Sequence, residues 1–120
     1  MDLRTIGSGA YAAAKPSAPQ AVAASDDATY RRLWSSLIGG GDPPAVDFTT
    51  DSAVFLLAGS KPTGGWSVEA RGAAVEGETL VIDAAIKSPP PGAIVTQAFT
   101  SPYAVAAVST KAFKDVRWKQ

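Results

Sequence analysis

The stretch Ala53–Ala58, with the sequence AVFLLA, is a continuous apolar run bounded by turn-forming residues. Its length and its branched and aromatic side chains are typical of a central strand whose two faces are both buried. Lys61–Gly65 follows with the composition of a tight turn, because Pro62 fixes its own φ and glycine readily reaches positive φ. Apolar and polar side chains then alternate over residues 66–71, which predicts a half-buried strand paired back on the first as a hairpin.

Shorter segments of β character lie on both sides of this hairpin. They are Leu3–Ile6, Gln20–Ala24, Thr79–Ile86, Ile94–Phe99, Tyr103–Val108 and an edge strand around Val116 and Trp118. The first of them is expected to end at Gly7–Gly9. Pro89–Pro91 cannot donate ladder hydrogen bonds and predicts a stiff connection, with a polyproline ligand segment as the alternative. No connection is long enough for repeated helical crossovers, which favours antiparallel pairing.

One amphipathic helix is expected between residues 25 and 39. Ser25 has the side chain of an N-cap, and Asp26 and Asp27 place negative charge where the helix dipole is positive. Five apolar side chains then recur at helical spacing on one face: Tyr30, Leu33, Trp34, Leu37 and Ile38. Gly39 stands where a left-handed C-cap is expected. This face requires a sheet to cover it, so Trp34 is predicted to lie in the core.

These elements predict a mainly β fold, or α+β by element count. We expect an antiparallel β-sandwich or sheet of about seven short strands, with one N-terminal amphipathic helix packed on it. The chain has 120 residues, the usual size of one domain, so residues 1–120 are expected to form a single unit with one core.

Composition narrows the classes of function. The formal net charge is zero, with 11 basic and 11 acidic residues, so the chain offers no field suited to nucleic acid. The apolar runs are too short to span a bilayer. Cysteine and histidine are both absent, which removes disulfides, zinc–sulfur sites, the commonest general base and the commonest transition-metal ligand. We therefore expect no cofactor, no metal site and no enzymatic activity.

Two kinds of catalytic site remain as weaker alternatives, for a small hydrolase without histidine. Lysine can replace histidine as the base for a hydroxyl nucleophile, and three lysines have hydroxyl neighbours: Lys61 near Thr63, Lys87 near Ser88 and Lys111 near Thr110. Paired carboxylates hydrolyse glycosides, yet no spacing selects two of the acidic residues Asp42, Asp47, Asp51, Glu69, Glu76, Glu78 and Asp83. The first three of these also have the oxygen ligands that calcium prefers, without the EF-hand pattern.

The start of the chain shows no secretory leader. Met1 is followed by Asp2 and Leu3, without a basic region that leads into an apolar stretch. The protein is therefore either cytosolic or numbered from after a removed leader, and the sequence leaves both open.

Three ordered segments carry a resemblance to a known family. Pro44–Phe48 contains an Asp-Phe pair, Gly59–Glu69 contains Pro-Thr-Gly-Gly-Trp, and Thr96–Tyr103 ends in Thr-Ser-Pro-Tyr. In this order they resemble the C-terminal domain of the PrcB family, named for a subunit of a bacterial surface protease complex, over residues 20–110. Trp66 stands where the family usually has tyrosine, and the lipoprotein-type leader of many relatives is missing. The resemblance implies an exported or cell-envelope protein that associates with a protease or another protein partner.

The Lys61–Trp66 turn also resembles the Asn-Pro-Thr-Thr-Gly loop of chagasin-type cysteine-protease inhibitors. These are immunoglobulin-like sandwiches that insert three loops into a protease cleft. Their Arg-Pro-aromatic loop has no counterpart unless Ser101–Tyr103 takes its place. Protease inhibition is therefore the alternative function.

The candidate partner-binding surface combines two turn-rich segments, each with an aromatic residue of the type favoured at the centre of protein interfaces. Its residues are Lys61, Pro62, Thr63, Gly64, Gly65, Trp66, Thr100, Ser101, Pro102 and Tyr103. The alternative is that the glycines only close a hairpin while Trp66 and Tyr103 fill the core. The oligomeric state is left open, with the edge of the strand at Trp118 as a candidate for self-association.

Overall fold

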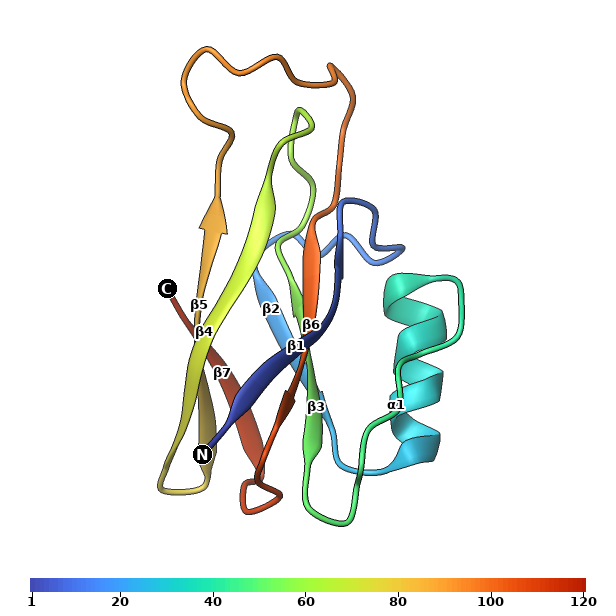
Figure 1. Cartoon of the computed structure of the whole chain (residues 1–120), viewed down its shortest axis with the longest axis vertical. Helices are drawn as coiled ribbons and strands as arrows, with labels where there is room; N and C mark the ends of the chain where they lie inside the picture. Colours follow the sequence, from blue (N-terminus) through green and yellow to red (C-terminus); the bar gives the residue numbers. More distant parts are fainter.

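Two β-sheets and one helix make up the computed structural model, which describes residues 1–120 (Figure 1). The first sheet has the order β1–β6–β3–β2, with β1 at Leu3–Gly9, β2 at Gln20–Ala24, β3 at Ser52–Leu57 and β6 at Tyr103–Val108. The second has the order β4–β5–β7, with β4 at Ser67–Glu76, β5 at Thr79–Lys87 and β7 at Asp115–Lys119. The helix α1 spans Asp27–Leu33 and continues as one π-helical turn, Trp34–Ile38. The predicted fold class, mainly β with one packed helix, is confirmed.

β3 is the central strand of the molecule, as its apolar sequence predicts. It pairs antiparallel with β2 on one side and with β6 on the other, and all 6 of its residues are buried. Phe55 and Leu57 pack in the cluster under the helix, whereas Val54 and Leu56 pack against the second sheet. Because both faces of β3 are covered, its side chains are continuously apolar. In a strand with one solvent-exposed face, apolar and polar side chains would alternate.

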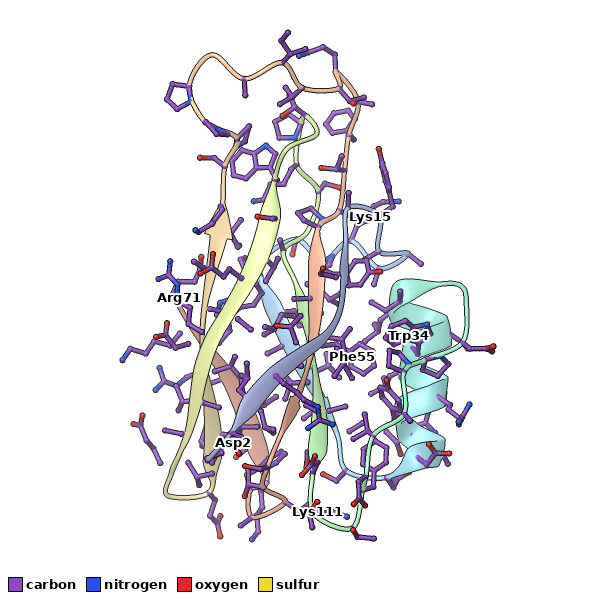
Figure 2. The ribbon with its side chains drawn as sticks, in the orientation of Figure 1. Asp2, Lys15, Trp34, Phe55, Arg71 and Lys111 are labelled. Carbon is purple, nitrogen blue, oxygen red and sulfur yellow. The ribbon has the colours of Figure 1, made fainter.

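The helix covers the outer face of the first sheet. Trp34 and Phe55 point toward one another between the helix and β3, with ring centroids 6.2 Å apart (Figure 2). The Tyr30 ring lies 5.9 Å from Phe55, and its hydroxyl donates to the Pro44 carbonyl at 2.7 Å. Burial raises the pKa of the Tyr30 hydroxyl. Trp34 lies in the core, as predicted.

The N-terminal cap of the helix differs from the expected residue. Asp26, rather than Ser25, is the N-cap, and its carboxylate accepts hydrogen bonds from the Thr29 backbone N–H at 2.8 Å and the Thr29 hydroxyl at 2.9 Å. These bonds hold the pKa of the Asp26 carboxyl below its ordinary value. Gly39 ends the helix at positive φ, as expected, but its φ of 110° and ψ of −33° lie outside the left-handed helical region that the C-cap prediction implied. The helix also lies in mid-chain, after two strands, rather than at the N-terminus.

The predicted hairpin between β3 and β4 is wrong. β3 belongs to the first sheet and β4 to the second, so Lys61–Gly65 carries the chain from one sheet to the other. β4 pairs instead with β5 across the turn Gly77–Glu78, where Gly77 has a φ of 66°. The reason is that alternation of side chains encodes which face of a strand is buried, and does not encode which strand lies beside it.

Two further strand predictions are corrected. Ile94–Phe99 pairs with no strand and lies in the loop between β5 and β6, because β propensity without a partner strand does not make a ladder. β7 is an edge strand, as predicted, but it pairs parallel with β5. β6 comes between these two strands in the sequence and belongs to the other sheet, so the chain re-enters the second sheet in the direction of β5.

β1 continues through Gly9 instead of ending at Gly7. A Cβ at Gly7 would lie 3.2 Å from the Trp34 ring, and a Cβ at Gly9 would lie 2.9 Å from the Tyr103 ring. The two glycines therefore let the strand pass close to these aromatic rings.

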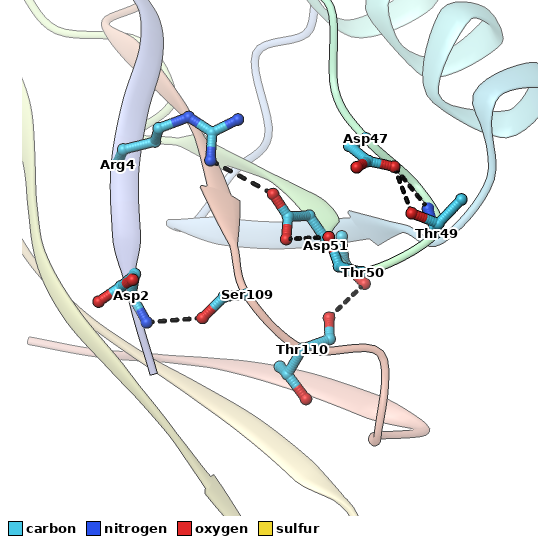
Figure 3. A network of polar contacts seen from close by, with 9 residues as sticks. Asp2, Arg4, Asp47, Thr49, Thr50, Asp51, Ser109 and Thr110 are labelled. Carbon is cyan, nitrogen blue, oxygen red and sulfur yellow. Dashed lines mark hydrogen bonds and ion pairs between the residues drawn. The ribbon is translucent and has the colours of Figure 1, made fainter.

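One end of the molecule is rich in acidic residues. It comprises residues 2–4, 25–27, 47–52, 76–79 and 109–115, and we call it the carboxylate end (Figure 1). Its acidic side chains are Asp2, Asp26, Asp27, Asp47, Asp51, Glu76, Glu78 and Asp115. Arg4 pairs with Asp51 at 3.3 Å, and the Thr49 hydroxyl and N–H donate to Asp47 (Figure 3). The bonds from Thr49 hold the pKa of the Asp47 carboxyl below its ordinary value.

Candidate partner-binding surface

Three loops lie toward the end of the molecule opposite the carboxylate end, where the second and third extend furthest and the first contacts their bases at Gly59 and Ser101 (Figure 1). They are residues 10–19 between β1 and β2, residues 58–66 between β3 and β4, and residues 88–102 between β5 and β6 (Figure 1). We call these three segments together the loop end. Both predicted site segments lie there, with Tyr103 as the first residue of the adjoining strand β6.

A short ladder joins the two predicted site segments. The Lys61 N–H donates to the Thr100 carbonyl at 2.8 Å, and the Thr100 N–H donates to the Lys61 carbonyl at 2.9 Å. The Thr100 hydroxyl donates to the Thr63 carbonyl at 2.7 Å, and the Gly64 N–H donates to the Thr96 carbonyl at 2.9 Å. These bonds place the two segments side by side.

Ser101 ties the first loop to the same place. Its N–H donates to the Ala10 carbonyl at 2.7 Å, and its hydroxyl donates to the Ala12 carbonyl at 2.7 Å. Gly59 also fits against this loop, with a φ of +84° and room for no side chain. A Cβ on Gly59 would lie 2.5 Å from the Pro16 carbonyl oxygen. Only glycine meets both conditions, so the sequence at this position is fixed by the contact between two loops.

Burial divides the predicted site residues into two groups. Thr100, Ser101 and Pro102 are each 2% exposed or less, so their side chains hold the loops together and do not face a partner. The remaining residues are exposed or partly exposed: Lys61, Pro62, Thr63, Gly64, Gly65, Trp66 and Tyr103. The accessible part of the predicted surface is therefore Lys61–Trp66 together with the edge of Tyr103.

Trp66 and Lys61 form the aromatic and charged part of this surface. The Lys61 ammonium lies 5.1 Å from the centroid of the Trp66 ring, within cation–π range. The Trp66 indole N–H donates to the Thr63 hydroxyl at 3.2 Å. Trp66 and Tyr103 are both half-buried, and Tyr103 also packs on the cluster under the helix. The two aromatics therefore combine a structural contact with an accessible edge.

The sequence interpretation missed the most exposed apolar side chains of the loop end. Ile94 is 102% exposed, Phe99 77% and Tyr11 66%. The first two were assigned to the strand that does not form. The signal that could have located them is the charge pattern, because no charged residue occurs between Lys87 and Lys111.

Charge is divided unevenly between the two ends. Lys15 and Lys61 are the only charged residues in the three segments of the loop end, whereas most carboxylates lie at the carboxylate end. Figure 2 shows Lys15 toward the loops and Asp2 at the opposite end. Because the formal net charge is zero, this separation gives the molecule a charge dipole along its long axis.

The lysines considered for a hydrolase contact groups other than the neighbouring hydroxyls. Lys87 pairs with Glu69 at 2.7 Å and holds the pKa of that carboxyl below its ordinary value. The Lys111 ammonium donates to the Phe48 carbonyl at 2.6 Å, and Lys61 lies over Trp66. No group of three or more acidic side chains is placed to hold a metal ion, and the surface has no pocket.

The order of motifs on these loops agrees with a comparison against protein families, in which the model described as PrcB C-terminal matches residues 52–109. This segment is similar to the PrcB C-terminal family. The PrcB C-terminal segment begins at β3 and ends just after β6, so it contains Lys61–Trp66 and Thr100–Tyr103. The resemblance found from the sequence is confirmed over these residues. No curated protein and no solved structure gives a significant match. No helix of this protein is both long and apolar enough to cross a bilayer.

Proposed function

We propose that this protein is a non-enzymatic accessory domain of an exported or cell-envelope bacterial protein, and that it binds another protein through its loop end. The proposed partner is a protease or a subunit of a protease complex. The PrcB C-terminal segment supports this choice, because the family is named for such a complex and both site segments lie within residues 52–109.

The observation that carries the proposal is the pair of hydrogen bonds between Lys61 and Thr100. They join two loops that are remote in sequence, and they leave Lys61 and Trp66 accessible beside one another. A surface that is already fixed loses little conformational entropy on binding. Tryptophan and tyrosine are also the residue types that contribute most at protein interfaces.

The test compares variants in capture experiments with an extract of the native organism. We expect the full chain to retain a specific protein, and Trp66→Ala to reduce the retained amount by about tenfold or more, the effect of removing an interface hot spot. Arg117→Ala, at an exposed position on β7, is the matched control and should retain the protein like the wild type. Equal retention by all variants would contradict the proposal.

A stability measurement separates a surface role of Trp66 from a core role. Phe55, which is fully buried, should lose about 3–5 kcal/mol of unfolding free energy when replaced by alanine. Trp66→Ala should lose clearly less, because the ring is half-buried. If both variants lose the same amount, Trp66 is a core residue and the proposed surface fails.

Protease inhibition is a second candidate, favoured by the meeting of three loops at one end. Chagasin-type inhibitors, which the Lys61–Trp66 turn resembles, present three loops to a protease cleft. Here Ser101 ties residues 10–12 to the 88–102 loop, and Lys61 ties that loop to the 58–66 loop. The candidate predicts that micromolar protein slows a papain-like protease, and unchanged cleavage would remove it.

A further inference from the structure

Residues 91–99, in the loop between β5 and β6, form an exposed segment whose backbone is largely free. Every residue of the segment except Val95 is exposed. The N–H groups of residues 94–99 have no hydrogen-bond partner in the chain. An endopeptidase binds its substrate as an extended strand and pairs with backbone groups on both sides of the bond that it cuts. The segment therefore has the free backbone that such an enzyme requires.

The other long loops are tied to the fold through their backbone or their side chains. In the 10–19 loop, the N–H groups of Ala12, Ala13 and Ala14 donate to carbonyls of other segments. In the segment before β7, the N–H groups of Ser109 and Lys114 donate in the same way. Two apolar side chains between residues 42 and 51 pack in the cluster under the helix. Of these loops, the 91–99 segment therefore needs the least local unfolding to enter an enzyme.

Exposure alone would select the peptide bonds that follow Tyr11 and Phe99, whose side chains are 66% and 77% exposed. The residue after each of them, however, is fixed. The Ala12 N–H and the Thr100 N–H each donate to a carbonyl of another loop at 2.9 Å. Both peptide bonds therefore have their N–H group in use, and they cannot enter an enzyme cleft unless these contacts break.

Basic residues offer no other cleavage site at the loop end. Lys15 precedes Pro16, and Lys61 precedes Pro62. Proline has no N–H and restricts the residue before it, so bonds of this kind resist trypsin-like enzymes. A cut in this region therefore requires an enzyme that recognises uncharged residues.

The Ala93–Ile94 bond joins a small residue to a large apolar one, and both residues are exposed. The Ile94 N–H is unbonded, and one hydrogen bond, from the Ala93 N–H to the Pro90 carbonyl at 3.1 Å, has to open before the segment becomes extended. Val95, half-buried next to Gly65, begins the part of the loop whose side chains are held to the fold. Elastase accepts a small side chain before the bond that it cuts, and thermolysin a large apolar one after it. Two enzymes with different catalytic groups should therefore choose this bond.

We propose that the Ala93–Ile94 bond is a processing site, at which an endopeptidase specific for apolar residues cuts this domain. Water adds across the bond: the C–N bond breaks, Ala93 gains a carboxylate and Ile94 gains an amino group. The contacts that join the loop to Lys61 lie beyond the cut, so the candidate partner-binding surface keeps its shape. This role goes beyond the proposed protein binding and does not depend on it.

The cut domain stays assembled. Fragment 1–93 contains β1 to β5, and fragment 94–120 contains β6 and β7. β6 lies between β1 and β3, and its residues 104–108 are at most 1% exposed. β7 pairs with β5 in the other sheet. Separation of the fragments would expose these core side chains to water, so burial of apolar surface holds the fragments together without the peptide bond.

Limited digestion of the full chain tests the site, with elastase and thermolysin in separate reactions and mass spectrometry of the products. Both enzymes should first produce fragments 1–93 and 94–120. Chymotrypsin should leave the Phe99–Thr100 bond intact under the same conditions, because the Thr100 N–H is bonded. Ile94→Pro should remove the first cut by both enzymes, because proline brings no N–H to the bond. Ala18→Pro, at an exposed residue of the 10–19 loop whose N–H is also unbonded, is the matched control and should be cut like the wild type.

The assembly of the cut domain has its own readout. The cut protein should elute from gel filtration at the volume of the intact chain, and its fragments should separate only in denaturant. Its melting temperature should depend on protein concentration more than that of the intact chain, because unfolding then releases two chains. A first cut at any other bond, or Ile94→Pro cut at the wild-type rate, would overturn the site. Separation of the fragments on gel filtration would overturn the assembly of the cut domain.

Discussion

At the loop end, the loops are joined by backbone groups and neutral hydroxyls, whereas at the carboxylate end aspartate side chains make many of the contacts. Lys61, Thr100 and Ser101 contribute N–H groups, carbonyls and hydroxyls to the first set of contacts. Asp47 and Asp51 accept bonds of the second set (Figure 3), and Asp26 accepts others from Thr29. Both ends belong to the same sheets, so the difference lies in the loops and not in the strands.

The two ends should therefore differ in their response to pH, because neutral hydrogen bonds hold the loop end and titrating carboxylates make contacts at the carboxylate end. Neutral hydrogen bonds do not depend on pH in the physiological range, and salt screens them little. The shape of the loop end is therefore expected to be constant under conditions that change the carboxylate end. The following predictions test this independence.

The largest expected effect comes from adding one methyl group at a loop contact. Gly59→Ala forces a Cβ to 2.5 Å from the Pro16 carbonyl oxygen at positive φ, and should lose about 2–4 kcal/mol of unfolding free energy. Gly77→Ala, in the β4–β5 turn of the carboxylate end, also has positive φ but meets nothing within 4 Å, and should lose only about 1 kcal/mol. Denaturant unfolding measures both. Equal losses would mean that the loops are not held against each other.

A matched pair of serines gives the next effect. Ser101→Ala leaves the Ala12 carbonyl without its buried hydroxyl donor, and Ser52→Ala does the same to the Thr110 carbonyl at the other end. Each should lose about 1–3 kcal/mol. Amide hydrogen exchange should rise around residues 10–12 in the first variant and around residues 109–112 in the second. Faster exchange at both ends in either variant would show that the two ends are coupled.

The ion pair of the carboxylate end should contribute less. Arg4 is more than half exposed, and its pair with Asp51 spans 3.3 Å, so Arg4→Gln should lose less than about 1 kcal/mol. The loss should shrink further in high salt, because screening weakens an exposed pair. Thermal unfolding at low and high salt measures it. A loss larger than that of Ser52→Ala would contradict the assignment of this pair as a surface contact.

The smallest effect is a dependence on pH, which involves the carboxylate end and, outside it, the Glu69–Lys87 pair. Hydrogen bonds from Thr29 and Thr49 lower the folded pKa of Asp26 and Asp47, so their contribution to stability is present above about pH 4 and is lost as the pH falls through the folded pKa. Acidification should therefore lower the amide protection factors, which correct for the intrinsic effect of pH on exchange, at residues 26–29 and 47–51 before it lowers those at the Lys61–Thr100 contact. Asp26→Asn/Asp47→Asn should flatten this dependence. A loss of amide protection in the loop end at a higher pH than at the carboxylate end would contradict the independence of the two ends.

Sequence reasoning located most of the strands and the helix because side-chain burial has a period. The run Ala53–Ala58 identified the central strand, and the apolar face of the helix placed Trp34 in the core. The pairing of strands was not predictable in the same way. The turn Lys61–Gly65 has hairpin chemistry, yet it joins two sheets, because the position of Gly59 against Pro16 and of Lys61 against Thr100 directs the chain.

The candidate surface was predictable in its position but not in its composition. Turn-forming residues beside aromatics singled out Lys61–Trp66 and Thr100–Tyr103, and the structure places these segments together. Burial of Thr100, Ser101 and Pro102 and exposure of Ile94 and Phe99 depend on which loops cover which side chains. Those contacts join residues far apart in the chain, so no local pattern records them.

By itself, the sequence determined the mainly β class, the central strand, the helix and the resemblance of residues 52–109 to the PrcB C-terminal family, because each depends on local spacing or on an ordered motif. Only the tertiary structure decided that β3 and β4 lie in different sheets, that β7 runs parallel to β5, and that loops without carboxylates lie toward one end (Figure 1). These outcomes depend on contacts between distant segments. The free energy that stabilises these arrangements comes from the burial of apolar surface, which occurs only once distant segments have come together.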